Sequence, residues 1–185
     1  PLSNLDAKLR EDMRHEIKSL VKRLETTTLY VTHDQLEALS MSDTVALLRD
    51  GVVVQEGAPR DVYLSPADPF AANFLGRTNL LEGVVVEGGL VETRWGTFNC
   101  PLPEWATTGT QVRVGFRPEN VSLSQARPVD GALNVLEGTI ATASFAGDVV
   151  EYQVELGDRL VRVKGHPHAL FAEGHKVFVH VPGER

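Results

Sequence analysis

The chain has 185 residues, 42% of them hydrophobic, which is the composition of an ordinary globular protein with room for one large domain or two small ones. Its formal net charge of -7 argues against a reader of DNA or RNA, because such proteins usually carry a basic face. Cys100 is the only cysteine, which excludes an intrachain disulfide and favours a reducing compartment.

No apolar run reaches the roughly 20 residues that a membrane-spanning helix needs, and the first residues carry no signal-peptide pattern. We therefore expect a soluble, cytoplasmic chain. Residues 1–6 enter directly into a patterned segment without a methionine, which we interpret as a cut end or a processed terminus.

The first third of the chain alternates between helical and strand patterns. Apolar residues recur at helical spacing between Asp6 and Leu24, and Asp6 is a suitable N-cap for that helix. Residues 27–32 are rich in β-branched and aromatic side chains, so they predict a buried strand that His33 ends. Residues 34–39 return to a helical composition.

Turn signals and prolines organise the next stretch. Residues 45–48 and 52–55 predict two strands around a turn at Asp50 and Gly51. Between residues 58 and 76, short helical pieces are punctuated by three prolines, each able to start a helix but not to sit inside one: Pro59, Pro66 and Pro69.

From Leu80 onward the chain is a succession of short strand patterns. They cover residues 83–87, 90–94, 111–116, 134–145, 149–156, 159–164 and 176–181. Many short strands with glycine turns predict a small barrel or sandwich, with a domain boundary near residues 76–80. We find no repeat of fixed short period, but the β-rich stretches on either side of residues 128–131 are candidates for paired barrel-like halves.

Several motifs resemble those of the ATPase subunits that power bacterial ABC importers. Residues 1–6 (Pro-Leu-Ser-Asn-Leu-Asp) are similar to the D-loop, and residues 30–38 (Tyr-Val-Thr-His-Asp-Gln-Leu-Glu-Ala) look like the switch-histidine segment. Residues 46–66 and 74–79 resemble the end of the same nucleotide-binding domain. Residues 115–119 (Gly-Phe-Arg-Pro-Glu) look like a signature of the accessory TOBE domain.

This resemblance implies an α/β fragment of a P-loop ATPase domain at residues 1–75, followed by an all-β, OB-like TOBE barrel at residues 76–185. It implies that His33 contacts the γ-phosphate of ATP as a catalytic and nucleotide-binding residue, because imidazole can donate a hydrogen bond without a permanent full charge. The resemblance assigns the loop that crosses a subunit interface to Ser3, Asn4, Leu5 and Asp6. Without it, His33 would simply end a strand and Asp6 would simply cap a helix.

The other phosphate-binding parts of that family do not occur in these 185 residues. We find no Gly-x-x-x-x-Gly-Lys-Ser P-loop, glutamine loop, Leu-Ser-Gly-Gly-Gln signature or Walker B aspartate with its catalytic glutamate. ATP and Mg²⁺ are therefore expected as cofactors of the parent protein, with neither binding tightly to this chain. We predict that the chain alone has no ATPase activity.

The expected function is that of the C-terminal part of an import ATPase, coupling ATP binding and hydrolysis to solute uptake. The implied partners are a second copy of the chain and a transmembrane permease, with no nucleic acid, at the inner face of a bacterial membrane. Residues 74–79 look closer to polyamine and ferric-iron importer subunits than to sugar importer subunits. Alternatives are a regulatory or ligand-binding dimerisation module without catalysis, and an oligonucleotide-binding barrel, which the acidic charge disfavours.

Other candidate residues favour structural roles. Four histidines raise the question of a zinc site, but no cysteine or carboxylate lies at a recognised finger spacing, so we expect surface residues and no metal: His166, His168, His175 and His180. Cys100 has no Cys/His arrangement around it, which disfavours a nucleophile. We interpret Trp95, Trp105 and Phe98 as core or interface aromatics rather than a base-stacking face.

Overall fold

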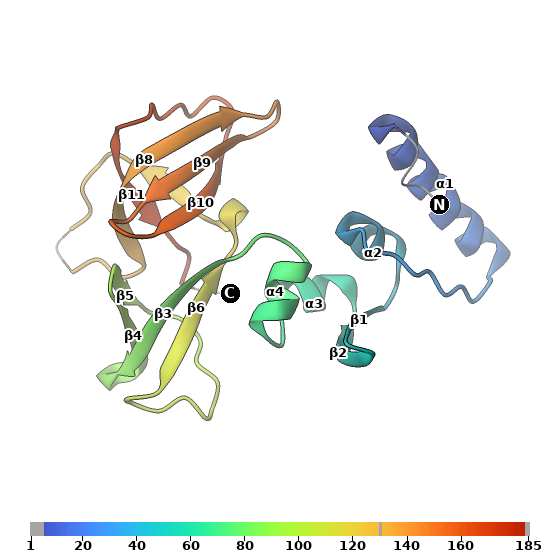
Figure 1. The fold of residues 1–185 in the computed structure, drawn as a ribbon, viewed down its shortest axis with the longest axis horizontal. Coiled ribbons are helices and arrows are strands. Elements are labelled where there is room, and N and C mark those ends of the chain that lie inside the picture. Colours follow the sequence, from blue (N-terminus) through green and yellow to red (C-terminus); the bar gives the residue numbers. More distant parts are fainter. Residues whose placement is uncertain (1–5, 130, 184–185) are drawn as a thin grey trace. The chain divides into compact units, whose positions relative to one another are not determined.

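The computed structural model describes residues 6–129 and 131–183, and the chain divides into two compact units. Unit 1 comprises residues 1–77 and unit 2 comprises residues 78–185. Unit 1 consists of helices and one hairpin, whereas unit 2 is built mainly of β-strands (Figure 1). No helix in the described residues is both long enough and apolar enough to cross a membrane.

Unit 1 begins with helix α1 (Ala7–Leu24), which confirms the predicted helix and its cap. Asp6 is the N-cap, and its carboxylate accepts a hydrogen bond from the Leu9 N–H at 2.8 Å. At the other end Glu25 adopts a left-handed conformation, with φ 51°, and its N–H bonds the last carbonyls of the helix. Local chemistry therefore sets both ends of α1.

The predicted strand at residues 27–32 does not form. The segment after α1 runs without regular structure as far as Asp34, and its side chains at Leu29 and Val31 are 91% and 83% exposed. A strand needs a neighbour that accepts and donates its backbone hydrogen bonds, and the described residues pair no strand with this segment. The prediction was wrong because β propensity describes how well side chains fit a sheet and cannot supply one.

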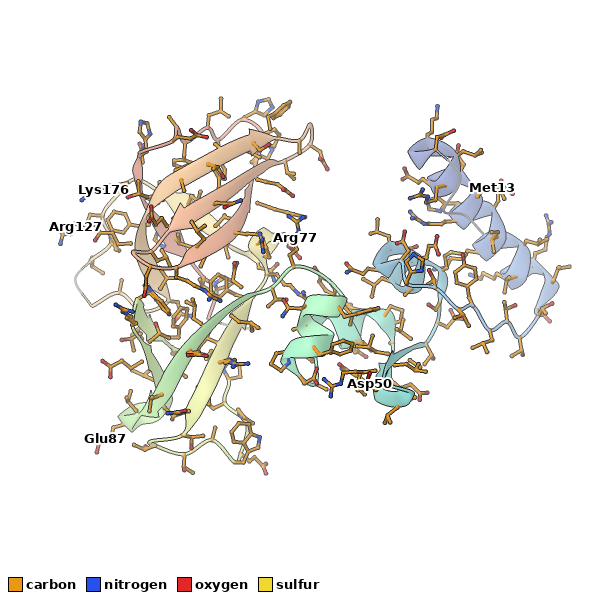
Figure 2. The ribbon with its side chains drawn as sticks, in the orientation of Figure 1. Met13, Asp50, Arg77, Glu87, Arg127 and Lys176 are labelled. Atoms are coloured by element: carbon orange, nitrogen blue, oxygen red, sulfur yellow. The ribbon has the colours of Figure 1, made fainter. Side chains whose placement is uncertain are left out.

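A hairpin and three short helices complete unit 1. Helix α2 (Gln35–Met41) precedes strands β1 (Val45–Arg49) and β2 (Val52–Gly57), and helices α3 (Pro59–Leu64) and α4 (Pro69–Phe74) follow. Asp50 lies at the tip of the β1–β2 hairpin (Figure 2), where both turn residues have positive φ, 53° and 81°, as the predicted turn requires. The buried apolar residues are Val45, Leu47, Val62, Ala71, Ala72 and Leu75.

Two of the three prolines start helices as predicted, since Pro59 and Pro69 occupy the first helical positions of α3 and α4. Pro66 starts none, and it lies in the connection between these helices. The Gln55 amide holds that connection, donating to the Ser65 carbonyl at 2.9 Å and accepting from the Ala67 N–H at 2.8 Å. The side chain of β2 thereby satisfies the backbone on both sides of Pro66.

Unit 2 contains two antiparallel sheets. The four-stranded sheet has the order β5-β4-β3-β6, and the five-stranded sheet has the order β10-β9-β8-β11-β7. The strands are β3 (Asn79–Val86), β4 (Leu90–Thr93), β5 (Gly96–Phe98), β6 (Gln111–Phe116), β7 (Ser122–Ser124), β8 (Val135–Phe145), β9 (Val150–Glu155), β10 (Leu160–Gly165) and β11 (Lys176–His180). The seven predicted strand patterns all fall on these strands, and the sequence missed only β5 and β7, whose three residues are too few to show an alternation.

Both sheets contribute to a single hydrophobic core in unit 2. Along β9, Val150, Tyr152 and Val154 are buried while the residues between them are exposed, which confirms the predicted alternation. Phe98 of β5 and Leu136 of β8 are 1% and 0% exposed in the same core. Figure 1 shows the two sheets, with β3–β6 in green to yellow and β8–β11 in orange to red.

Unit 2 contains an internal structural repeat. The sequence Asn-x-Leu-Glu-Gly occurs at residues 79–83, in β3, and again at residues 134–138, where β8 begins. Leu81 and Leu136 both enter the core. β3 lies between β4 and β6, and β8 lies between β9 and β11, so the order β5-β4-β3-β6 corresponds to β10-β9-β8-β11. The two sheets are therefore two copies of one arrangement, with β7 added to the second.

Backbone hydrogen bonds match between the two copies. Val85 exchanges two bonds with residues 109–110, at 2.8 and 2.9 Å, and Ile140 makes the same pair with residues 174–175, again at 2.8 and 2.9 Å. The paired halves predicted on either side of residues 128–131 correspond to these copies. Only β7 departs from that division, because it precedes residues 128–131 in the chain yet pairs with β11 of the second copy.

Two buried asparagines join the copies to each other. Asn79 of the first copy donates its amide N–H to the Arg162 carbonyl and accepts from the Arg162 N–H, both at 2.8 Å. Asn134 of the second copy makes the same pair with the backbone of Asn99, at 3.0 and 2.7 Å. Each amide thus takes the place of a neighbouring strand at the edge of the opposite sheet.

Candidate functional site

The residue predicted to meet a phosphate, His33, lies at a bend between the extended segment and α2, and it is exposed. Asp34 follows it and caps α2, its Oδ1 accepting from the N–H groups of Leu36 and Glu37 at 2.8 and 3.2 Å. The bend is further fixed by the Asp34 N–H, which donates to the Thr32 hydroxyl at 2.9 Å. His33 is therefore presented at the start of a capped helix.

A buried carboxylate supports the segment before His33. Glu37, 6% exposed, accepts hydrogen bonds at Oε2 from the hydroxyls of Thr32 and Tyr30, at 2.6 and 3.1 Å. Burial of a carboxylate is costly unless donors surround it, and these two hydroxyls supply them. Because both donors come from the extended segment, Glu37 fixes that segment against α2 even though no sheet holds it.

Helix α1 packs against α2 through two long basic side chains. Arg14 donates from Nη2 to Asp34 Oδ2 at 3.2 Å, with side chains that are 14% and 30% exposed. Lys18 donates from Nζ to the Ser40 carbonyl at 2.6 Å, close to the end of α2 where carbonyl groups lack helical partners. The two contacts hold α1 to both ends of α2. Sequence reasoning assigned no role to Arg14 or Glu37, because each appears in sequence as an ordinary helix-surface charge.

The predicted interface loop is only partly visible. Ser3, Asn4 and Leu5 lie outside the described residues. Asp6 is exposed at the start of α1 and serves as its cap, which is the simpler of the two roles that the sequence left open. Asp6 bonds within the first turn of α1, whereas the His33 bend is joined to α1 further along, at Arg14.

The phenol of Tyr30 gives the site a pH dependence. Burial and then the hydrogen bond to Glu37 raise the pKa of Tyr30 above its ordinary value of 10.0. The folded state therefore keeps this proton longer than the unfolded state, so the contact stabilises fully below pH 10.0 and its contribution is lost as the pH rises through the higher folded pKa.

We expect a phenolate titration, followed by ultraviolet absorbance, to include a component above pH 10.0 that Tyr30→Phe removes. Glu37→Gln is expected to lower the pKa of Tyr30 only in part, because burial, the larger cause, remains. Tyr63→Phe serves as the matched control and should leave this component in place. A component unaffected by Tyr30→Phe would contradict the assignment.

The C-terminal histidines do not form a cluster with other metal-binding side chains. The rings of His166 and His168 lie tilted against each other with centroids 5.2 Å apart, and His175 contacts the Gln125 amide at 3.1 Å. Among the described residues, no three His, Cys, Asp or Glu side chains form a group that could hold a metal ion. Burial raises the pKa of the Cys100 thiol, which packs against the core of unit 2. A raised pKa keeps the thiol protonated and poorly nucleophilic.

The predicted aromatic residues differ in their surroundings. Phe98 is buried and stacks on Phe116 with centroids 6.4 Å apart, and Trp95 packs against the core. Trp105 is 69% exposed and is not a core residue. Only the first two therefore take the core role that the sequence suggested.

A family model described as the TOBE domain matches residues 107–185, all within unit 2. The spermidine/putrescine import ATP-binding protein PotA of Ruegeria pomeroyi is 38% identical over 192 residues, covering 100% of this chain and 51% of that protein. The protein of the same name from Thermotoga maritima is 37% identical over 180 residues, covering 92% of this chain and 48% of that protein.

A further relative is the Fe(3+) ions import ATP-binding protein FbpC of Brucella melitensis, 39% identical over 157 residues, covering 84% of this chain and 43% of that protein. A structure of the cytoplasmic molybdate-binding protein ModG superposes with a TM-score of 0.48 and 15% identity, covering 57% of this chain and 91% of that one. The chain spans about half the length of the curated relatives it matches. Over most of its length the chain is therefore similar to ATP-binding subunits of ABC importers, and its residues 107–185 match the TOBE domain.

Proposed function

We propose that this chain is the C-terminal part of an ATP-hydrolysing import subunit that couples ATP binding and hydrolysis to solute uptake. Unit 1 contributes the switch histidine and the D-loop to a P-loop ATPase domain, and unit 2 is the accessory TOBE domain. In that protein, ATP and Mg²⁺ are bound largely by the P-loop and Walker B residues of the family. His33 donates a hydrogen bond to the γ-phosphate, where it stabilises the charge of the transferred group.

The observation that carries this proposal is the extended segment before His33. Leu29 and Val31 are exposed apolar side chains on a segment with strand-forming composition, and they alternate with Tyr30 and Thr32, which bond to Glu37. Insertion into a larger sheet would cover the side chains of Leu29 and Val31. It would also give the backbone of this segment the hydrogen-bond partners of a neighbouring strand. His33 would then stand at the carboxyl end of a strand, where α/β domains bind their ligands.

The partners follow from the same proposal. A second copy of the chain would receive the loop of Ser3, Asn4, Leu5 and Asp6, and a transmembrane permease would be driven by closure of the pair at the inner face of the membrane. The relatives named for spermidine/putrescine import and for Fe(3+) import support polyamines and ferric iron as the substrate classes of this chain. The formal charge of -7 gives a nucleic-acid partner no support.

Hydrolysis tests the proposal. The purified chain of 185 residues is expected to release no phosphate from Mg-ATP above a buffer blank. Fusing it to the N-terminal half of the Ruegeria pomeroyi relative should restore hydrolysis, and His33→Ala in the fusion should reduce kcat about 100-fold, the effect of removing one donor to a transition-state oxygen. His166→Ala is the matched control and should leave kcat unchanged. Turnover by the chain alone, or full activity of the His33→Ala fusion, would refute the proposal.

A second candidate is a regulatory or ligand-binding dimerisation module without catalysis. It is favoured by the self-contained core of unit 2 and by the two asparagine pairs that close it. Sedimentation distinguishes the two candidates. A dimer that survives removal of residues 1–77 would support the module, whereas a monomer would count against it.

A further inference from the structure

The two residues on either side of His33 are both anchored through their side chains. Thr32 donates to Glu37, and Asp34 accepts from the first N–H groups of α2 and from Arg14. In the described part of the chain, no residue forms a hydrogen bond with the His33 imidazole. The direction in which the imidazole points therefore depends on how its neighbours are held.

Arg14 is the one of these anchors that comes from another helix. Its side chain is only 14% exposed, and its Nε is buried with no hydrogen-bond partner among the described residues. A guanidinium that is largely removed from water with one donor unsatisfied does not contribute much to stability, because its remaining hydrogen bonds only partly offset the cost of desolvation. Its recorded ion pair, Nη2 to Asp34 Oδ2 at 3.2 Å, is directed at the residue that follows His33.

We propose that Arg14 is a positioning residue for His33. By holding Asp34 from α1, it sets the orientation of the bend and hence the direction of the imidazole. Lys18, bonded to the Ser40 carbonyl, fixes α1 against the opposite end of α2, so the helix that carries Arg14 is itself held in place. The binding of a phosphate by His33 rests on the proposed function. The positioning of His33 by Arg14 is a property of this chain without ATP.

Arginine suits this role because its planar fork fixes both distance and direction to a carboxylate, whereas lysine provides only a mobile point charge. The acidic groups facing the bend are Asp34, which Arg14 neutralises, and Glu37, which the two hydroxyls satisfy. Loss of Arg14 leaves the Asp34 carboxylate held only by the helix cap and removes the ion pair that fixes the bend to α1.

The test follows the Cε1–H signal of His33 in the ¹H–¹³C NMR spectrum of the whole chain, assigned with His33→Gln. Arg14→Met is expected to displace that signal by more than one linewidth, without moving the four histidines of unit 2. Arg14→Lys should recover part of the displacement. Arg23→Met, on an exposed position of the same helix, is the matched control and should have no effect.

A double-mutant cycle decides whether Arg14 acts through Asp34. In an Asp34→Asn background, which keeps a cap-forming side chain, Arg14→Met is expected to add no further displacement of the His33 signal. Two results would overturn the positioning role. One is a His33 signal that Arg14→Met does not move, and the other is an equal displacement by Arg14→Met in the original and the Asp34→Asn backgrounds. If Arg14→Met loses helix by circular dichroism, Asp34→Asn alone must displace the same signal.

These outcomes are separable from those of the hydrolysis experiment. An inactive fusion would overturn the proposed function and leave the His33 displacement intact. An active fusion combined with an unmoved His33 signal would overturn only the role of Arg14.

Discussion

Gly138→Ala is expected to lower the free energy of unfolding of unit 2 by about 3 kcal/mol, the upper range for overpacking a core. An ideal Cβ on Gly138 would lie 2.6 Å from Val154 Cγ1 and 2.7 Å from the Glu155 carbonyl oxygen. The carbonyl belongs to β9, which pairs with β8, so relief requires the two strands to separate. A flexible side chain could turn away, but a paired backbone cannot.

The measurement is urea denaturation followed by tryptophan fluorescence, which reports on unit 2 because both tryptophans, Trp95 and Trp105, lie in it. Gly115→Ala is the matched control, since its nearest obstacle is the flexible end of Leu80 at 3.3 Å. We expect that control to change stability by less than about 0.5 kcal/mol. Equal losses at Gly115 and Gly138 would show that strand glycine content, not close approach, sets the cost.

Gly83 extends this test to the repeat. Its Cβ would lie 2.7 Å from Val91 Cγ1 and 2.8 Å from the Glu92 carbonyl oxygen, nearly the same surroundings as at Gly138. Gly83→Ala should therefore destabilise unit 2 by an amount similar to Gly138→Ala. A much smaller loss would mean that the two copies are alike in pattern but not in packing.

Asn134→Asp is expected to cost about 3 kcal/mol, because a buried polar group loses its donor and acquires a charge. The Asn134 side chain accepts from the Asn99 N–H at 2.7 Å and donates to the Asn99 carbonyl at 3.0 Å. Aspartate has nearly the same shape, yet it can only accept, so one carboxylate oxygen would face the Asn99 carbonyl oxygen. The residue is 8% exposed, which leaves little solvent to screen that repulsion.

Backbone conformation and hydrogen bonding can be separated at this position. Asn134 has φ 60°, so Asn134→Gly keeps the left-handed conformation while removing only the amide pair. We expect Asn134→Gly to lower the free energy of unfolding by about 2 kcal/mol, less than Asn134→Asp, when it is measured by the same fluorescence method. Asn79→Asp should repeat the larger loss at the other junction, while Asn120→Asp, at an exposed position of unit 2, should be neutral. Stability unchanged by Asn134→Asp would show that the amide pair does not hold the two copies together.

The structure of unit 2 shows why part of the fold was readable from the sequence. Val150, Tyr152 and Val154 alternate with charged residues because one face of β9 meets the core and the other meets solvent. That alternation, with a tight turn after it, specifies a hairpin locally. The repeat was present in the sequence as Asn-x-Leu-Glu-Gly, but its meaning depends on buried asparagines that pair with strands distant in the chain.

The candidate site was predicted only in its central residue. The segment around His33 was recognised by motif, and Asp34 as a helix cap agrees with local chemistry. Arg14 and Glu37 were not found, because a basic or acidic residue on an amphipathic helix looks solvated until its neighbours are known. Only the packing of α1 and the extended segment on α2 gives both residues their partners.

The sequence by itself determined the elements whose causes are local: the caps of α1 and α2, the Asp50–Gly51 turn and the alternating strands of unit 2. The tertiary structure alone decided whether residues 27–32 form a strand, which edges Asn79 and Asn134 close, and what surrounds Glu37. The physical reason is that a cap or turn satisfies hydrogen bonds within a few residues, whereas a strand or a buried polar group needs a partner supplied from elsewhere in the fold.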